Sequence, residues 1–440
     1  MTGRREFLAG AAGSLLAQAP KRKPNIVFIL ADDLGCFDLG CYGQKLIRTP
    51  NIDRLAAEGL RFTHAYAGAT VCAPSRCSLM TGMHQGHATI RGNHSMRTRE
   101  RVPLNASDVT VAETLKTAGY ATGIFGKWGL GEPDTSGEPN RQGFDDWFGF
   151  LNQDHAVHYF TDHLWRNGKK EILRGNLDGR RTEYTTDLFT REALRFIRAH
   201  RNEPFFLYLP YTAPHADFEA PSDDPYSAMP WPAEAKTLAA MVSRMDDGIG
   251  QLMRLLRESK LDQDTIVFFS SDNGAGHKRL IKFFRSTGEL RGAKGEVYEG
   301  GIRAPMIARW PGRIRPGAVS GEPWTFYDFA PTAAELAGAA PMQGIDGVSM
   351  VPALTGGKQP RRDYFYWESH KGKRFDQAAR IGDWKAVRLG AGPVELYDLR
   401  EDEGEVKDLG ADKPELAARA REIFRTARTE SAEYPGRVAG

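Results

Sequence analysis

The sequence predicts an α/β fold: a large, mostly parallel β-sheet flanked by helices, followed by a smaller C-terminal antiparallel sheet with a helix. Two observations support this prediction. Continuous apolar and β-branched runs at 23–33, 204–211 and 264–271 are typical of strands buried on both faces, and segments of helical periodicity separate them. After residue 360 the pattern changes to short alternating strands, which favours an antiparallel sheet.

Two of the buried runs end in acidic or amide side chains. Run 23–33 ends in Asp32 and Asp33, and run 264–271 leads into Asp272 and Asn273. Either pair alone is compatible with a simple turn, but the same ending on two buried strands indicates more than turns. Open α/β sheets place ligands at the C-terminal ends of their strands, and hard divalent cations prefer oxygen ligands. The pattern therefore predicts an oxygen-rich cation site at this edge.

The remaining elements of the larger part follow from periodicity and start signals. Short strands are expected at 121–125 and 306–310. The block 145–168 is rich in aromatic residues and histidines, and either lines a substrate cleft or packs beneath a long loop. Helices are expected where apolar residues recur at helical spacing, at 50–60, 74–80, 109–119, 186–200, 237–260 and 326–336. The methionines of 237–260 are more typical of core packing than of function.

A Gly-, Pro- and Lys-rich break at 356–360 separates the C-terminal part of the chain. Strands are expected there at 364–368, 377–381, 384–388 and 395–398, and a helix at 414–428. We therefore predict two folded domains, 20–360 and 361–440, after an N-terminal signal at 1–19.

The N-terminus has the pattern of a twin-arginine export signal. Arg4 and Arg5 precede a short apolar run that closes on Ala17-Gln18-Ala19. Pro20 weakens the cleavage site, so a retained membrane-surface anchor and a disordered basic arm stay open as alternatives. The pattern predicts an exported protein, periplasmic or secreted.

Composition excludes several classes of protein. The 59 Lys and Arg residues nearly balance the 56 Asp and Glu residues, which argues against nucleic-acid binding. No apolar run approaches the roughly 20 residues of a transmembrane helix. Four cysteines are too few for a disulfide scaffold, and spacing alone does not decide whether Cys36 and Cys41 pair.

The stretch 72–82 is the most distinctive feature of the chain. Pro74 and Ser75 predict that a helix starts here, which places Cys72 at its N-terminus. Anions are favoured at that end of a helix, and a thiol there is activated. An isolated cysteine of this kind would more often be a buried structural residue. This stretch, however, resembles the signature of the type I sulfatases, in outline C-x-P-S-R-x-x-L-x-T-G. It has the Cys-x-Pro-Ser-Arg core and the later Leu79, Thr81 and Gly82.

The resemblance extends over about 24–409 and implies the alkaline-phosphatase-like fold of that family. It implies that Cys72 is oxidised by a formylglycine-generating maturation enzyme to Cα-formylglycine, whose hydrate is the nucleophile. One hydroxyl of the hydrate attacks sulfur, and the second then loses its proton, expels sulfate and restores the aldehyde. A serine lacks that second hydroxyl.

The resemblance also assigns partners to this nucleophile. Asp32, Asp33, Asp272 and Asn273 match the Ca²⁺ ligands, and the modified Cys72 completes the set. Arg76 matches the arginine that holds the hydrate. Lys127 and Lys294 match the lysines that bind sulfate, and His215 matches the histidine near the leaving-group oxygen. His215 or Lys294 would protonate the departing alcohol.

One position departs from the family pattern. Many relatives have a histidine after Gly-Lys-Trp, and that histidine helps deprotonate the second hydroxyl, whereas this chain has Gly129. We expect His87, His155 or His158 to take over, and we include His155 and His158 among the substrate-binding residues. His277 is a further, weaker substrate-site candidate.

We predict a Ca²⁺-dependent sulfuric ester hydrolase of the arylsulfatase kind. The segments 126–131 and 163–168 look like those of bacterial glycan-directed members, which favours a sulfated carbohydrate such as sulfated galactose or N-acetylgalactosamine. The alternatives are a phosphodiester or phosphonate hydrolase on the same fold, and a non-catalytic binder of sulfated glycans that lacks the modification.

Overall fold

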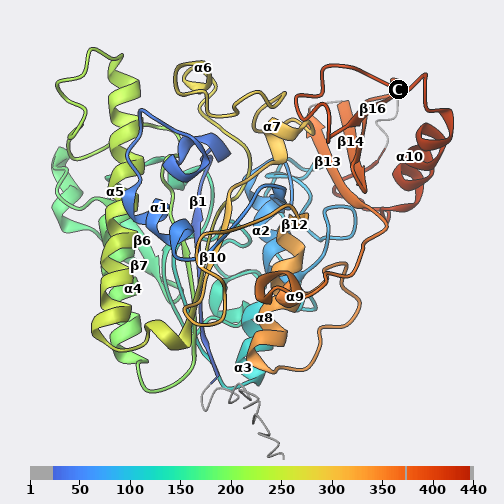
Figure 1. Ribbon diagram of the computed structural model, residues 1–440. Helices are drawn as coiled ribbons and strands as arrows, with labels where there is room; N and C mark the ends of the chain where they lie inside the picture. The colour runs from blue at the N-terminus through green and yellow to red at the C-terminus, as the bar shows by residue number, and fades with distance from the viewer. Residues whose placement is uncertain (1–22, 372–373, 437–440) are drawn as a thin grey trace, which may run out of the picture.

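A ten-stranded sheet forms the centre of the protein, and helices cover both of its faces (Figure 1). The computed structural model describes residues 23–371 and 374–436. The export signal predicted at 1–19 lies outside these residues. None of the described helices has the length and apolarity needed to cross a membrane.

The predicted parallel strands form the middle of the sheet. β1 (Asn25–Ala31) lies between β8 (Phe205–Pro210) and β9 (Thr265–Ser271), parallel to both. β4 (Ala121–Lys127) and β5 (Asp146–Phe150) continue the parallel order beyond β8. Every residue of β1 is buried, which explains why its sequence is a continuous apolar run rather than an alternating one.

Shorter strands complete the two sides of the sheet. β10 (Met306–Arg309) runs antiparallel to β9, and β2 (Leu60–Phe62) and β11 (Ala318–Ser320) follow it to the edge. β6 (His163–Arg166) and β7 (Lys169–Ile172) extend the other side as antiparallel strands. A separate parallel pair, β3 (Ala65–Tyr66) and β12 (Trp324–Thr325), forms a two-stranded sheet.

Alternate residues of β1 enter two different cores. Val27 and Ile29 pack with α1 (Pro50–Ala57), α4 (Thr185–Ala199) and α5 (Ala233–Glu258). Ile26 and Phe28 pack on the opposite face with α2 (Cys72–Thr81), α3 (Val111–Thr117) and α8 (Phe329–Ala337). The methionines of α5 lie in the first core, as predicted.

The C-terminal part is the predicted four-stranded antiparallel sheet with one helix. Its strands are β13 (Phe365–Lys371), β14 (Arg374–Ile381), β15 (Trp384–Leu389) and β16 (Val394–Asp398), and α10 (Pro414–Thr426) covers one face. The other face packs against the larger part of the protein. At this contact Trp367 donates a hydrogen bond to the carbonyl of Ala67 at 2.9 Å. Short helices α6 (Ile281–Phe284), α7 (Glu299–Ile302) and α9 (Val351–Thr355) lie in the connections.

Two predicted elements differ from the structure. The helix expected at 50–60 ends at Ala57, and Leu60 lies in β2. Gly59 makes this change of direction possible, because a Cβ there would lie 2.4 Å from the carbonyl oxygen of Ala308. The block 145–168 contains β5 and β6, so many of its aromatic residues are core residues of the sheet.

Candidate active site

The two acidic strand ends meet, as the sequence predicts. The last residue of β1, Ala31, pairs in register with Ser271 of β9, so the acidic residues that follow lie side by side. The backbone N–H of Asp33 donates to Asp272 Oδ1 at 3.2 Å, and Asn273 Nδ2 donates to Asp33 Oδ1 at 2.8 Å. Asp33 has a φ of 68°, a left-handed conformation that aspartate tolerates better than most residues.

Helix α2 brings its arginine into this acidic group. Arg76 is fully buried, and its Nε and Nη2 donate to Asp272 Oδ2 at 3.0 and 2.8 Å. Nη2 also reaches Asp32 Oδ2 at 3.2 Å, and Nη1 donates to the carbonyl of Lys127 at 2.6 Å. The planar guanidinium thus joins the C-terminal ends of β9, β1 and β4.

Two lysines neutralise the other carboxylates. Lys127, the last residue of β4, is fully buried and lies 2.5 Å from Asp32 Oδ2. Lys294 comes from the loop before α7, and its Nζ lies 2.6 and 2.8 Å from the two oxygens of Asp33. Arg76, Lys127 and Lys294 therefore balance Asp32, Asp33 and Asp272, three charges against three.

The pKa values of two of these carboxylates are shifted in opposite directions. Burial works to raise the pKa of Asp32, but Lys127, His215 and Arg76 outweigh it and lower the pKa. Burial and the neighbouring Asp32 raise the pKa of Asp272 despite its contacts with Arg76. Closely packed carboxylates that share counter-charges behave in this way.

The oxygen atoms of this group fit a hard divalent cation. Asp32 Oδ1 and Asn273 Oδ1 are buried, and among the described residues neither has a hydrogen-bond partner. Ligand atoms of Asp32, Cys72 and Asp272 lie within 4.8 Å of one another. Buried, unpaired oxygens are costly unless a ligand satisfies them, and carboxylate and amide oxygens are the ligands that Ca²⁺ takes. The structure holds the unmodified thiol of Cys72, which is not a Ca²⁺ ligand.

Cys72 is the first residue of α2, as predicted, and it is 1% exposed. Ser75 does not cap this helix; its hydroxyl accepts the backbone N–H of Gly68 instead, at 3.0 Å. The side chain that caps it is that of Asn93, a residue not predicted from the sequence. Its Oδ1 accepts the N–H of Ala73 at 3.1 Å and lies 3.6 Å from Cys72 Sγ. No local pattern marks Asn93, because it lies in an irregular segment after α2.

The candidate histidines do not all lie at the acidic group. His215 lies beside the acidic group, with Nε2 3.9 Å from Asp33 Oδ2, and burial lowers its pKa. His87 instead pairs with Asp346 at 2.9 Å, and His155 Nε2 bonds to Thr161 Oγ1 at 2.7 Å.

The remaining histidines have other surroundings. His158 is exposed, and His277 Nε2 lies 2.8 Å from Ser286 Oγ. The structure thus joins only His215 directly to the predicted site residues. Beside Gly129 lies Gln153, whose Nε2 would be 2.8 Å from a Cβ at that position.

The four cysteines of the chain are free, so Cys36 and Cys41 do not pair in this structure. Burial raises the pKa of Cys36 to about 12, which keeps that thiol protonated and inert.

Comparison with known proteins places this geometry in context. The sequence profile of the family described as Sulfatase matches residues 24–339. The profile described as N-sulphoglucosamine sulphohydrolase, C-terminal, matches residues 293–427. N-acetylgalactosamine-6-sulfatase of Canis lupus familiaris is 34% identical in an alignment 408 positions long, which covers 88% of this chain and 75% of that protein. Arylsulfatase A of Homo sapiens is 34% identical in an alignment 454 positions long, which covers 92% of this chain and 86% of that protein.

Solved structures agree with these sequence matches. Ps i-CgsB, determined in complex with k-i-k-neocarrahexaose, is 32% identical with a TM-score of 0.80, and the match covers 92% of each chain. Phosphonate monoester hydrolase of Agrobacterium radiobacter has a TM-score of 0.67 at 20% identity, over 92% of this chain and 95% of that one; at that identity the likeness shows the fold alone. The predicted alkaline-phosphatase-like fold is confirmed.

Proposed function

Because the chain belongs to the sulfatase family, we propose that it hydrolyses the sulfate ester of a sulfated carbohydrate at Cys72, with a bound Ca²⁺. The observation that supports this most strongly is the convergence at one sheet edge of Cys72, three carboxylates and three cationic side chains. Burying a charge costs free energy, and a purely structural role does not explain why all of these charged side chains are buried together at one sheet edge.

The charge balance favours an anionic substrate once a cation is bound. Three carboxylates and three cationic groups cancel, so a divalent ion would leave the site with two positive charges. A sulfate ester carries one negative charge and the released sulfate carries two. Asp32, Asp33, Asp272 and Asn273 would hold the ion, which when bound polarises the sulfate oxygens.

The side chains around Cys72 have roles that follow from their chemistry. Conversion of Cys72 to Cα-formylglycine would give a hydrated aldehyde with one hydroxyl to attack sulfur and another to release sulfate. Arg76, held on three sides, orients this group and adds positive charge. Lys127 and Lys294 would bind the sulfate oxygens. His215, at the edge of the acidic group, or Lys294 would protonate the leaving alcohol.

The substrate class rests on relatives and on the sequence. One relative is named N-acetylgalactosamine-6-sulfatase, and a similar structure was determined in complex with k-i-k-neocarrahexaose. Sulfated galactose or N-acetylgalactosamine is therefore the proposed substrate. His155 and His158, in the segment that follows β5, remain proposed substrate contacts.

Three further expectations belong to the same proposal. A formylglycine-generating enzyme is the maturation partner, since the modification does not form by itself. Export, to the periplasm or outside the cell, follows from the twin-arginine pattern, which would deliver the folded and modified protein. The boundary near residue 360 separates a catalytic domain, 20–360, from the C-terminal domain, 361–440.

Mass spectrometry of the peptide containing Cys72, after co-expression with a maturation enzyme, tests this proposal. Conversion lowers the mass of the peptide by about 18 Da. We expect the converted protein to release sulfate from monosulfated galactose or N-acetylgalactosamine, and the Cys72→Ser protein to fold but to turn over poorly. Unconverted cysteine, or full activity in Cys72→Ser, would contradict the mechanism. Faster release of phosphate than of sulfate would favour a phosphodiester or phosphonate hydrolase instead.

A further inference from the structure

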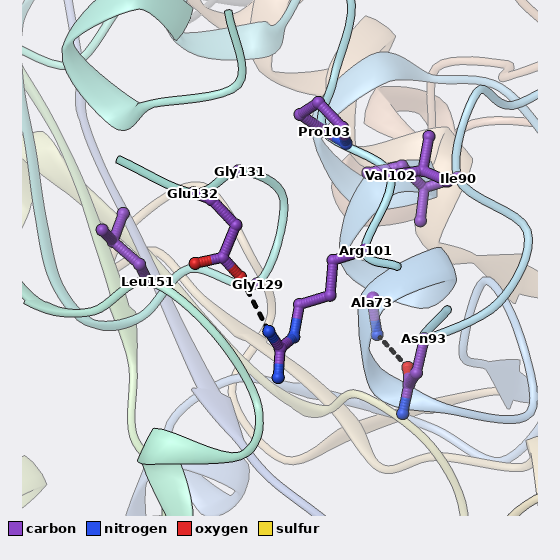
Figure 2. Close-up of a pocket in the computed structure, with 10 residues that line it drawn as sticks. All are labelled: Ala73, Ile90, Asn93, Arg101, Val102, Pro103, Gly129, Gly131, Glu132 and Leu151. Carbon is purple, nitrogen blue, oxygen red and sulfur yellow. Dashed lines mark hydrogen bonds and ion pairs between the residues drawn. The ribbon is translucent and has the colours of Figure 1, made fainter. Parts of the chain in front are cut away.

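A narrow pocket lies next to the start of α2, and nothing above assigns it a role. Its walls include Ala73, Asn93 and Gly129, together with Arg101 and Glu132 (Figure 2). Asn93 lines the pocket and also lies beside Cys72, since its Oδ1 is 3.6 Å from Cys72 Sγ. A group bound in the pocket would therefore be a near neighbour of a group bound at Cys72.

The charged side chains of the pocket hold one another in place. In Figure 2 the side chain of Arg101 lies between Glu132 and Asn93. Arg101 Nη1 donates to Glu132 Oε1 at 3.1 Å, and Nη2 is bound to the carboxylate of Asp154. Asn152 Nδ2 donates to the second oxygen of Glu132 at 3.1 Å. A guanidinium fixed in this way is pre-organised to contact a ligand.

Arg101 also has an unsatisfied donor. Its Nε–H is buried and has no hydrogen-bond partner among the described residues, although the side chain as a whole is 26% exposed. A buried donor without a partner is uncommon in native proteins and indicates a missing ligand or water.

The size and the charge of the pocket restrict that ligand. Its free space is about 10 Å³, close to the smallest that holds one water molecule. A single hydroxyl enters such a space, whereas a sulfate or carboxylate group does not. One positive charge on Arg101 faces two negative charges, on Glu132 and Asp154, and this excess disfavours a second anion. A hydroxyl group can bind to both Arg101 and Glu132, since it donates a hydrogen bond to a carboxylate and accepts one from a guanidinium.

We propose that Arg101 and Glu132 bind a hydroxyl group of the sugar that carries the sulfate ester, and so select a neutral sugar with a free hydroxyl next to the reacting group. This inference rests on the proposed function, because it assumes that the sugar is held at Cys72. It adds two specificity-determining residues to the site. Asp154, at the solvent side, orients Arg101.

The experiment compares a sugar substrate with an aryl substrate that lacks hydroxyl groups. We would measure kcat/KM of the converted protein on monosulfated galactose, monosulfated N-acetylgalactosamine and 4-nitrophenyl sulfate. In Arg101→Ala and Glu132→Gln the ratio of the sugar value to the aryl value should fall by about tenfold or more, since hydrogen bonds to charged groups are the stronger ones. The exposed neighbours Arg99→Ala and Glu100→Gln serve as matched controls and should leave the ratio unchanged. An unchanged ratio in both pocket variants would overturn the proposal.

A binding measurement separates this inference from the proposed function. Isothermal titration of the same sulfated sugars into Cys72→Ser protein needs no turnover. Arg101→Ala in this background should weaken binding by about tenfold or more. If the unaltered protein releases no sulfate but Arg101→Ala still weakens binding, the proposed function fails and the subsite stands. Equal affinities, or no binding to either protein, would overturn the subsite.

Discussion

Replacing Arg76 by leucine tests whether this residue is the internal counter-charge of the acidic group. The change removes the guanidinium, with its charge and hydrogen bonds, and leaves a branched apolar side chain in its place. Four of its contacts, at 2.6 to 3.2 Å, go to Asp272, Asp32 and the carbonyl of Lys127. Breaking a buried ion pair by removing one partner costs about 3–5 kcal/mol. We expect the free energy of unfolding to fall by about that amount in EDTA.

Added Ca²⁺ should recover part of this loss, because it brings positive charge to the same carboxylates. Urea unfolding followed by circular dichroism, in EDTA and in Ca²⁺, measures both effects. Arg254→Leu, at an exposed position of α5, is the control and should change the free energy of unfolding by less than about 0.5 kcal/mol. A loss below about 1 kcal/mol for Arg76→Leu in EDTA would refute the reasoning, since Asp272 and Asp32 would then not depend on this charge.

Two further predictions concern acid stability and the cation site. Burial holds the pKa of His84 at about 4, below the roughly 6.5 of an unfolded chain, so the unfolded state takes up the proton first as the pH falls. The free energy of unfolding should therefore decrease between about pH 6.5 and 4, by up to about 3 kcal/mol from this group, and less steeply in His84→Asn; equal slopes of stability against pH in the two proteins would contradict this. In Gly276→Ala the new Cβ would lie 2.2 Å from Asp33 Oδ2, so the carboxylate must move, and we expect the Ca²⁺-dependent rise in melting temperature to shrink; a rise equal to that of the unaltered protein would argue against Asp33 as a ligand.

The sequence was informative wherever one short stretch carries the whole signal. The buried strands of the sheet were predictable because both faces of β1 and β9 are covered, so every residue had to be apolar. Their acidic ends were predictable for the same reason, since a carboxylate directly after such a strand must lie at the sheet edge. The strands β2 and β6 were missed because they are too short, or too polar, to differ from loops.

The mutual arrangement of the site residues needed the tertiary structure. The sequence indicated Cys72, Arg76, Lys127 and Lys294 separately, but not that the three cationic side chains pair with the carboxylates at the strand ends. Nor did it separate His87, His155 and His158; in the structure His87 is paired with Asp346 and His155 with Thr161.

The sequence by itself determined the fold class, the family resemblance and the likeness of residues 72–82 to a nucleophile signature, because these depend on local composition and spacing. Only the tertiary structure brought Asn93, Arg101 and Glu132 to the side of α2. These residues lie on irregular segments, which have no periodicity to predict their direction, and their positions depend on packing between parts of the chain that are distant in sequence.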